Sequence, residues 1–405
     1  MNVLFVHNNF PAQFGAVAQA LAREQGVRVA AIGSPTARPV PGVTVLRYDD
    51  ARRADPAVVH PFARRFETEC RRAEQVLYAA TALRASGFVP DVVVAHPGWG
   101  ETLPLREAFP TARHIVYCEF YYAAEGGDVG FDPEFPGYGL DGRVAIDMKN
   151  AATLLALAGR ARGVSPTRWQ RSTYPESLQP LIEVVHEGID TTRATPDPVA
   201  TVVLPDGRRL RVGDEVITFV ARNLEPLRGY HVFMRSLPRV LAARPNARVL
   251  IVGADGPGYG LRPPPGTTWK ARFLDEVAPR LDRERVHFLG PVAHDVFLDV
   301  LRVSSAHVYL TYPFVLSWSL LEAMSAGCLV IASDTPPLRE VIDGDTGVLV
   351  PFFDVPRLAD TVVEALAAPE RFRPLRAAAR RRVTAHYDRD RVCVPRMLRL
   401  VRGEA

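Results

Sequence analysis

The stretch from Tyr312 to Gly327 has the pattern of an anion-binding turn. It follows an apolar run, Val308 to Thr311, that predicts a buried strand, and it ends in a glycine suited to closing a helix. Ser317 or Ser319 can cap the helix in between, which leaves backbone N–H groups near Leu316 to Trp318 free for a ligand's phosphate. The stretch therefore predicts a phosphate site at a helix start.

Glu322 lies within the helix that this turn should begin. At about 100° per residue, Leu320, Ala323 and Met324 share one side of the helix, and Glu322 lies almost opposite to them. A carboxylate one turn behind a phosphate-binding helix start can accept hydrogen bonds from both hydroxyls of a ribose diol. A solvated helix residue is the alternative, and the segment alone does not decide between the two.

Polar residues also follow apolar runs in the first half of the chain. The loop from His7 to Gly15, the residue His96 and the segment from Cys118 to Tyr122 each come directly after such a run. Ligands of open α/β sheets bind at the carboxyl ends of strands, so these residues are candidate contacts. A polar loop, a structural histidine and an irregular connector are the alternatives. The first loop has no Gly-x-Gly-x-x-Gly, which argues against a dinucleotide-binding domain.

Length and composition describe an ordinary globular protein. The 405 residues suggest two domains, and 47% hydrophobic residues suffice for two cores. The formal net charge of +4 gives no indication of nucleic-acid binding. The basic residues are nearly all arginine, which points to a GC-rich bacterial genome rather than to a function.

Several features favour a cytoplasmic protein without a metal. The four cysteines show no Cys-x-x-Cys spacing, as expected for reduced thiols: Cys70, Cys118, Cys328 and Cys393. The first strand begins at the start of the chain, with no basic, long apolar or lipidation segment before it, so we expect a cytoplasmic location. The Asp-x-Asp matches at 343–345 and 388–390 are not interpreted as metal sites.

Short apolar runs alternate with amphipathic segments along both halves, which predicts two parallel α/β domains. The strands expected in the first half are Val3 to Val6, Arg28 to Ile32, Asp91 to Ala95, His114 to Tyr117, Ala161 to Val164 and Ile182 to Val185. Those of the second half are Val216 to Ala221, Ala247 to Val252, Arg285 to Leu289, Ala306 to Leu310, Leu329 to Ala332 and Gly347 to Val350. A hairpin around Asp206-Gly207 is expected shortly after the domain junction, which we place at 188/189.

The run from Phe314 to Ser319, together with Glu322, resembles the nucleotide-sugar motif of the family 4 retaining glycosyltransferases. That family has the GT-B fold, so the resemblance implies two Rossmann-like parallel-sheet domains facing a cleft. It implies a first domain of residues 1–188, completed by C-terminal helices of about 380–405, and a second domain of residues 189–379. Glu322 matches the ribose-binding Glu of the motif, whereas Phe314 replaces the Glu that contacts the donor sugar.

The resemblance implies roles for residues of the second domain. Arg222 and Arg228 match the Arg and Lys that grip the donor's diphosphate, where they would stabilise the departing nucleoside diphosphate. Two surface arginines are the alternative. The other expected donor contacts are Leu316, Ser317, Trp318, Ser319, Gly253, Leu289 and Pro291. Backbone atoms would read the base, and we expect UDP rather than GDP or dTDP.

In the first domain, His96 matches a family histidine that reaches the donor sugar or the reacting region, so it is counted with the two arginines as a catalytic candidate. The expected acceptor-side residues are Asn9, Phe10, Gln13, Glu119 and Tyr121. The Gly-rich, acidic and aromatic stretch that runs to Tyr138 is a candidate specificity loop, since carboxylates and aromatic faces hold sugars.

The sequence therefore predicts a retaining glycosyltransferase that moves a sugar from a nucleoside-diphosphate sugar to a sugar, glycoconjugate or small-molecule acceptor. It would need no metal or other cofactor, and polysaccharide or natural-product biosynthesis is the expected context. The resemblance implies that the departing phosphate oxygen takes the acceptor's proton, and we expect domain closure to exclude water. A GT-B phosphorylase or epimerase and a non-catalytic nucleotide-sugar-binding protein remain alternatives. A third is a peripheral membrane enzyme whose Arg-rich helix, 64–84, makes weak contact with a membrane surface.

Overall fold

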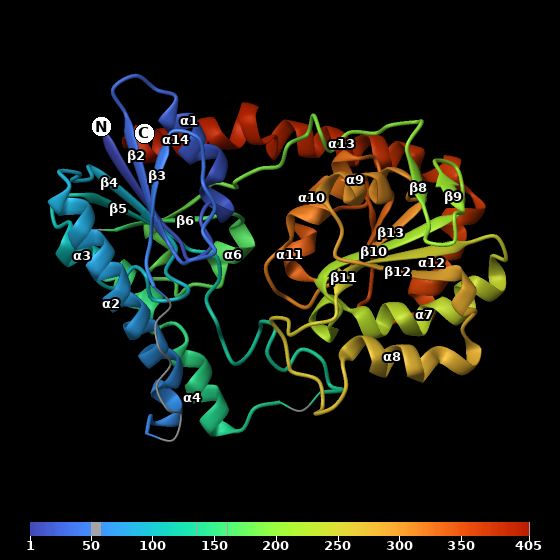
Figure 1. The fold of residues 1–405 in the computed structure, drawn as a ribbon. Helices are drawn as coiled ribbons and strands as arrows, with labels where there is room; N and C mark the ends of the chain where they lie inside the picture. The colour runs from blue at the N-terminus through green and yellow to red at the C-terminus, as the bar shows by residue number, and fades with distance from the viewer. Residues whose placement is uncertain (50–57, 136, 160, 405) are drawn as a thin grey trace. The chain divides into compact units, whose positions relative to one another are not determined.

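The structure is a computed structural model that describes residues 1–49, 58–135, 137–159 and 161–404. The chain forms two units: the first contains Met1–Gly188 and Arg389–Ala405, and the second contains Ile189–Asp388 (Figure 1). The return to the first unit comes at Arg389, later than the expected position near 380. The reason is that helix α13 (Arg373–His386) packs Ala379 and Val383 into the core of the second unit.

The first unit is built on a seven-stranded parallel sheet in the order β3-β2-β1-β4-β5-β6-β7. Its strands are β1 (Asn2–Val6), β2 (Arg28–Gly33), β3 (Val43–Arg47), β4 (Val92–Ala95), β5 (Arg113–Tyr117), β6 (Arg162–Ser165) and β7 (Ile182–Val184). All but β3 coincide with apolar runs expected from the sequence. The sequence did not predict β3, which is an edge strand with no fully buried residue.

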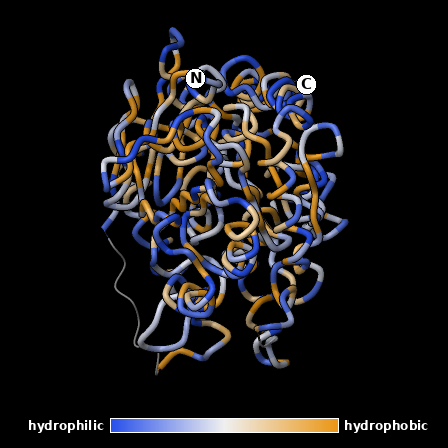
Figure 2. Tube along the Cα trace, turned by 90° about the vertical axis from the view of Figure 1, so that its right-hand side faces the viewer, coloured by the Kyte–Doolittle hydropathy of each residue, from blue (hydrophilic) through white to orange (hydrophobic). Residues whose placement is uncertain are grey.

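Helices cover both faces of this sheet (Figure 1). One face packs against α1 (Gly15–Ala22) and α14 (Val394–Arg402), and the other packs against α2 (Arg64–Ala85) and α3 (Leu105–Ala108). The remaining helices of the unit are α4 (Leu140–Met148), α5 (Ala151–Leu157) and α6 (Arg168–Ser172). Hydrophobic residues follow the strands and hydrophilic residues dominate the outer loops, as the hydropathy colouring of Figure 2 shows.

The second unit is built on a six-stranded parallel sheet in the order β12-β11-β10-β13-β14-β15. Its strands, all expected, are β10 (Val216–Asn223), β11 (Arg248–Ala254), β12 (Val286–Gly290), β13 (Ala306–Tyr309), β14 (Val330–Ser333) and β15 (Val348–Val350). The expected hairpin is also present, as β8 (Thr201–Val203) paired with β9 (Arg209–Arg211). The helices, besides α13, are α7 (Tyr230–Ala243), α8 (Trp269–Val277), α9 (His294–Arg302), α10 (Trp318–Ser325), α11 (Pro336–Arg339) and α12 (Val355–Ala367).

The strand order reverses once in each sheet, between β1 and β4 in the first unit and between β10 and β13 in the second. Such a switch point opens a crevice at the carboxyl ends of the two strands, because the connections leave in opposite directions. His7 and His96 follow β1 and β4, and Arg222 lies at the end of β10. The topology therefore places the candidate residues of each unit where α/β sheets bind ligands.

Among the described residues, no helix is both long enough and apolar enough to cross a bilayer. All four cysteines are free thiols; Cys70 is exposed and the other three are buried. Burial raises the pKa of the Cys118 and Cys328 thiols to about 12, so neither is a reactive thiolate near neutral pH.

Candidate functional site

His96 and Glu119 meet beyond the ends of β4 and β5. The Gly98 N–H donates to His96 Nδ1 at 3.0 Å, so the ring proton sits on Nε2, which donates to Glu119 Oε2 at 3.2 Å. The Gln13 side-chain amide donates to the other oxygen of Glu119 at 3.0 Å. His96 is buried, whereas the Glu119 side chain is 33% exposed. The structure thus brings Gln13, His96 and Glu119 into one hydrogen-bonded group with a carboxylate that a ligand can reach.

Neighbouring aromatic rings pack against His96 and fix its ring. The rings of Trp99 and His7 lie 4.6 and 5.1 Å from it, centroid to centroid. Burial, together with the neighbouring His96, holds the pKa of His7 well below its usual value. His7 is therefore uncharged near neutral pH, and it supports the His96 ring without adding positive charge to it.

Arginines of α2 hold the loop that carries His96. Arg65 donates to the Gly98 carbonyl at 2.8 Å and Arg72 donates to the Trp99 carbonyl at 2.7 Å. Gly100 closes the loop at φ +95°, and a Cβ there would lie 2.4 Å from the Glu69 carbonyl oxygen, so only glycine fits. Two arginines of the Arg-rich helix therefore hold this loop.

The other first-unit candidates are not in this group. Asn9 is exposed, and its side-chain oxygen accepts from the Thr36 hydroxyl at 2.9 Å. Tyr121 packs its ring against that of Tyr174, with a centroid distance of 5.5 Å. The expectation for Phe10 is wrong, because its side chain is fully buried in the core that β1, α1 and α14 share and cannot contact an acceptor.

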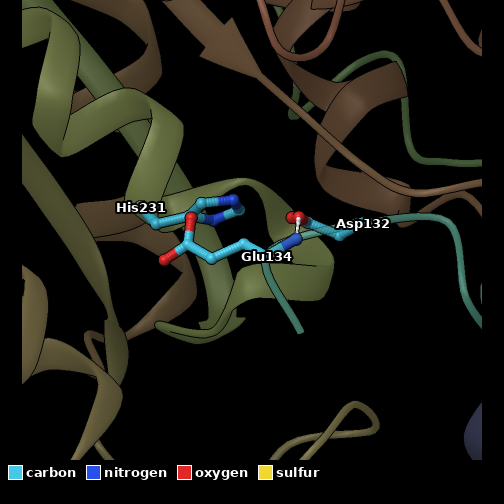
Figure 3. Close-up of side chains that lie close together, drawn as sticks. All are labelled: Asp132, Glu134 and His231. Atoms are coloured by element: carbon cyan, nitrogen blue, oxygen red, sulfur yellow. Dashed lines mark hydrogen bonds between the residues drawn. The ribbon is translucent and has the colours of Figure 1, made fainter. Parts of the chain in front are cut away.

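The candidate specificity loop is anchored at its start. Asn150 pairs with both backbone groups of Tyr122, and the Lys149 ammonium lies 4.8 Å from the centre of the Tyr122 ring. Further along, the Glu134 N–H donates to Asp132 Oδ1 at 2.9 Å (Figure 3). His231, also labelled in Figure 3, belongs to α7 of the second unit, where its ring lies 5.4 Å from that of Phe273. The first-unit loop is thus held by polar contacts rather than by a helix or strand.

In the second unit, a short 3₁₀ turn after β10 presents Arg228. The turn spans Pro226–Arg228 and ends at Gly229, which has φ +67° and where a Cβ would lie 2.3 Å from the Leu310 side chain. The Arg228 guanidinium donates to Thr311 Oγ1 and to the Val315 carbonyl, both at 3.0 Å. Arg228 is therefore fixed against the turn that the sequence marked as an anion site.

Tyr259 and Phe314 connect the two arginines. Arg222 donates to the Tyr259 hydroxyl at 2.8 Å, and its guanidinium lies 5.7 Å from the centre of that ring. The Tyr259 and Phe314 rings are 5.7 Å apart, and the Arg228 guanidinium lies 5.5 Å from the Phe314 ring. Within the described part of the chain, neither guanidinium forms an ion pair with a carboxylate. Both positive charges thus remain available to an anion.

Glu225 holds the loop that carries Tyr259, and sequence reasoning missed both residues. The buried Glu225 carboxylate accepts from the N–H groups of Tyr259 and Gly260 at 3.2 and 2.9 Å. Burial raises the pKa of Glu225, although these N–H groups and the two arginines act in the opposite direction. A Cβ on Gly258 would lie 2.0 Å from the carboxylate. The close Gly-Tyr-Gly spacing in 258–260 was the only sequence signal.

The helix start at Ser317 is built differently from the expectation. Ser317 is the N-cap residue of α10, but neither its hydroxyl nor that of Ser319 caps the helix; the two lie 2.6 Å apart. The Ser317 N–H, expected to be free, donates to the Tyr309 hydroxyl at 3.0 Å. Tyr309 thereby ties the end of β13 to the start of α10. Gly327 follows the C-cap Ala326 with φ +87°, as a helix-closing glycine does.

Glu322 does leave the core side of α10, as expected, but it has a partner. His294 Nε2, at the start of α9, lies 2.7 Å from Glu322 Oε1. The Glu322 side chain is 15% exposed and the His294 ring is 45% exposed. No residue spacing in the sequence predicts this contact, because the two residues lie on different helices.

The other donor-side candidates lie around these groups. A Cβ on Gly253, near the end of β11, would lie 2.6 Å from the Ala221 carbonyl oxygen, so this glycine lets β10 and β11 approach. Leu289, on β12, packs against a hydrophobic cluster, and Pro291 is exposed just beyond that strand. Trp318 is 42% exposed at the first position of α10.

Both units match models of glycosyl transferase families. Residues 25–194 match the model of the glycosyl transferase family 4 group, and residues 214–368 match that of glycosyl transferases group 1. Among curated proteins, a D-inositol 3-phosphate glycosyltransferase of Rhodococcus erythropolis is 33% identical over 203 residues, which is 49% of this chain and 44% of that protein. A GDP-mannose-dependent mannosyltransferase of Corynebacterium glutamicum is 28% identical over 52% of this chain and 53% of its own length. The similarity thus spans about half of these relatives.

Solved structures match over the whole chain. Sucrose-phosphate synthase from Thermosynechococcus elongatus superposes with a TM-score of 0.73 at 18% identity, covering 100% of this chain and 98% of that one. Anabaena HepE, solved in complex with UDP and glucose, has a TM-score of 0.66 at 14% identity and full coverage of both chains. At such identities the likeness establishes the fold. The chain therefore has the GT-B fold expected from its sequence, and each of its two Rossmann-like units carries a match to a glycosyl transferase family.

Proposed function

We propose that this protein is a retaining glycosyltransferase that moves a sugar from a nucleoside-diphosphate sugar to an acceptor. The observation that carries the proposal is the arginine pair at the switch point of the second sheet. Arg222 and Arg228 present guanidinium groups that no described carboxylate neutralises, beside the start of α10. Such a site suits a diphosphate, because the guanidinium fork matches phosphate oxygens and gains strength from an ionised partner.

The chemistry assigned to these groups is electrostatic. As the bond between the sugar's anomeric carbon and the phosphate oxygen breaks, Arg222 and Arg228 would stabilise the charge that develops on the departing diphosphate. The acceptor oxygen forms the new bond to the anomeric carbon, and its proton passes to the departing phosphate oxygen. This route needs neither a protein nucleophile nor a metal. Glu322 would accept hydrogen bonds from the ribose hydroxyls while His294 holds its Oε1.

The first unit would supply the acceptor side and a group that acts on the donor sugar. The partly exposed Glu119 carboxylate would accept a hydrogen bond from an acceptor hydroxyl, and His96 would contact the donor sugar. UDP is the expected nucleotide, and the UDP complex of the HepE structure is in keeping with this choice. Polysaccharide and natural-product acceptors both belong in the assay.

Thermal unfolding with UDP, GDP, ADP and dTDP, each with and without EDTA, tests the donor site. A nucleotide at about 100 times its dissociation constant should stabilise the protein by about 2.7 kcal/mol, or roughly 5 to 10 °C. We expect a shift with UDP that EDTA does not change and that Arg228→Ala removes. No shift with any nucleotide would rule out the glycosyl-donor function.

A non-catalytic nucleotide-sugar-binding protein is the second candidate, and Phe314 favours it. This side chain is buried under the Tyr259 ring, where the resembling motif has a carboxylate for the donor sugar. Incubation with the sugar nucleotide that corresponds to the bound nucleotide, with and without a panel of sugar acceptors, separates the two. Release of nucleoside diphosphate that requires an acceptor supports the transferase, whereas binding without release under any condition supports the second candidate.

A further inference from the structure

A gap in the helical cover of the first sheet leaves a cavity over β5. On this face α2 and α3 pack over β1, β2 and β4, while α5 packs near β5 and β6. With 4 and 7 residues, α3 and α5 extend over only about 6 and 10 Å. The cavity between them has a volume of about 590 Å³. Small-molecule sites commonly enclose about 300 to 1,000 Å³, so this one has room for a ligand.

The lining is apolar apart from a few basic and hydroxyl groups. The apolar residues around it are Ala95, Leu103, Leu105, Pro110, Ala112, Ile115, Val116, Leu155, Ala156, Ala158 and Ala161. Arg106, Arg113 and His114 supply the basic groups, and among the described lining residues none is acidic. The cavity is therefore an apolar space whose charged groups are all of one sign.

Arg106 is the basic group best placed to hold a ligand. It is carried by α3, and a Cβ on Gly159 would come within 3.0 Å of its terminal nitrogen, so the guanidinium reaches across to the segment that follows α5. Its ion pair is with the adjacent and largely exposed Glu107, at 3.6 Å. Arg113, by contrast, already donates to the Val401 carbonyl. The positive charge of Arg106 is thus compensated only weakly at the edge of the cavity.

Two further lining groups bear on the ligand's chemistry. The Thr102 side chain is 7% exposed, and its hydroxyl has no hydrogen-bond partner among the described residues. His114 Nε2 lies 3.1 Å from the Phe109 carbonyl, to which it can only donate, and burial lowers the pKa of the ring. His114 is therefore uncharged near neutral pH, and the buried Thr102 hydroxyl can donate to an oxygen-bearing ligand.

We propose that this cavity binds a single-chain amphiphile with an anionic head group, of the carboxylate or alkyl phosphate type. The apolar walls would take the chain and Arg106 would pair with the head group. A purely apolar ligand would leave the Thr102 hydroxyl without a partner, and a cationic one would face two arginines with no acid among the described lining residues. The inference rests on the first unit alone and does not depend on the proposed glycosyl transfer.

Four probes with the same eight-carbon chain test the proposal by titration calorimetry on the full chain, below the concentrations at which they form micelles. They are octanoate, octyl phosphate, octanol and octylammonium. We expect one octanoate or octyl phosphate per chain, binding about five- to tenfold more tightly than octanol, and no binding of octylammonium. Comparison of the two anions separates a carboxylate ligand from a phosphate ligand.

Variants locate the site. Arg106→Ala should bring anion affinity down to that of octanol and leave octanol binding unchanged, and Arg106→Lys should restore part of the difference. Leu155→Glu, at a 51% exposed lining position, should repel both anions without disturbing the fold. Arg84→Ala, an exposed arginine of α2 outside the lining, is the matched control and should change nothing.

Three results would overturn the proposal. One is equal binding of octanoate and octylammonium. Another is anion binding that Arg106→Ala and Leu155→Glu both leave intact. The third is the absence of saturable binding of either anion at about 1 mM, the weak end of specific affinity.

Discussion

The candidate groups of the two units are built in opposite ways, although both lie at a switch point of a parallel sheet. In the first unit the buried His96 is fixed by neighbouring rings and by a loop whose carbonyls accept hydrogen bonds from arginines of α2. In the second unit Arg222 and Glu322 have exposed partners, Tyr259 and His294, whereas Arg228 bonds to the buried Thr311. The first arrangement positions a group before any ligand arrives, whereas the second keeps charges that a ligand can take over.

The largest expected effect is on the charges of the second unit. Arg228→Ala should weaken binding of a nucleoside diphosphate by roughly 10- to 150-fold, because a charged hydrogen bond contributes about 1.5 to 3 kcal/mol. Titration calorimetry at two salt concentrations measures it, and the remaining affinity should depend less on salt. Arg239→Ala removes an exposed arginine of α7 that pairs with Asp360 and serves as the control. Equal losses of nucleotide affinity in Arg228→Ala and Arg239→Ala would mean that Arg228 contributes no more to binding than a surface arginine does.

Lowering the pH should destabilise the fold through protonation of buried histidines, of which His307 is an example. His307, on β13, is fully buried, and burial lowers its pKa to about 3, below the usual 6.5. The unfolded chain therefore takes up the proton first, and the stabilising contribution, complete above pH 6.5, is lost as the pH falls towards 3. Between pH 7 and 5 the loss should be about 2 kcal/mol.

Urea unfolding at several pH values measures this loss. His307→Gln should flatten the pH dependence of unfolding over that range, even if the variant is less stable throughout. His60, on the short helical turn before α2, is exposed, so His60→Gln should leave the pH dependence unchanged. An identical slope in the wild type and in His307→Gln would show that other groups cause the acid sensitivity.

The hydrogen-bonded group of the first unit should affect transfer and not nucleotide binding. The Glu119 carboxylate accepts from His96 and Gln13, whereas a glutamine there offers one accepting oxygen and turns an NH₂ group towards a donor. Glu119→Gln should reduce acceptor-dependent transfer about tenfold, or about 1.4 kcal/mol, with an unchanged nucleotide dissociation constant. Glu125→Gln, at an exposed glutamate of the same unit, is the control. Weaker nucleotide binding in Glu119→Gln would contradict this division of roles.

The smallest effect is expected at His294. If this ring orients Glu322 for a ribose diol, His294→Ala should weaken UDP about fivefold, close to 1 kcal/mol, and weaken 2′-deoxy-UDP less. Calorimetry on both nucleotides with both proteins gives the coupling between the ring and the 2′-hydroxyl. Asp295→Asn, at the next position of α9, is the control. Equal losses for the two nucleotides would mean that His294 acts on the fold and not on the ribose.

The strands and the turn that carries the two arginines could be predicted from the sequence because each depends on a pattern within a few neighbouring residues. An apolar run bounded by polar residues defines a buried strand, and Arg222 and Arg228 flank a turn within one short segment. The edge strand β3 lacked such a run. Phe10 was assigned to the acceptor side because its loop follows a strand and resembles a cleft-facing loop of the family, but an aromatic ring beside a core strand gains more by burial than by contact with a ligand.

By itself, the sequence determined the class of the fold and most of its strands, and it predicts the strand ends and the turn that hold the candidate residues. Only the tertiary structure decided which side chains share a contact: Gln13 and His96 on Glu119, Tyr259 on Arg222, and His294 on Glu322. Strands and turns follow from periodicity over a few residues, whereas these pairs join separate elements of a sheet or its helices. Their geometry exists only after the strands have taken their order and the helices have packed upon them.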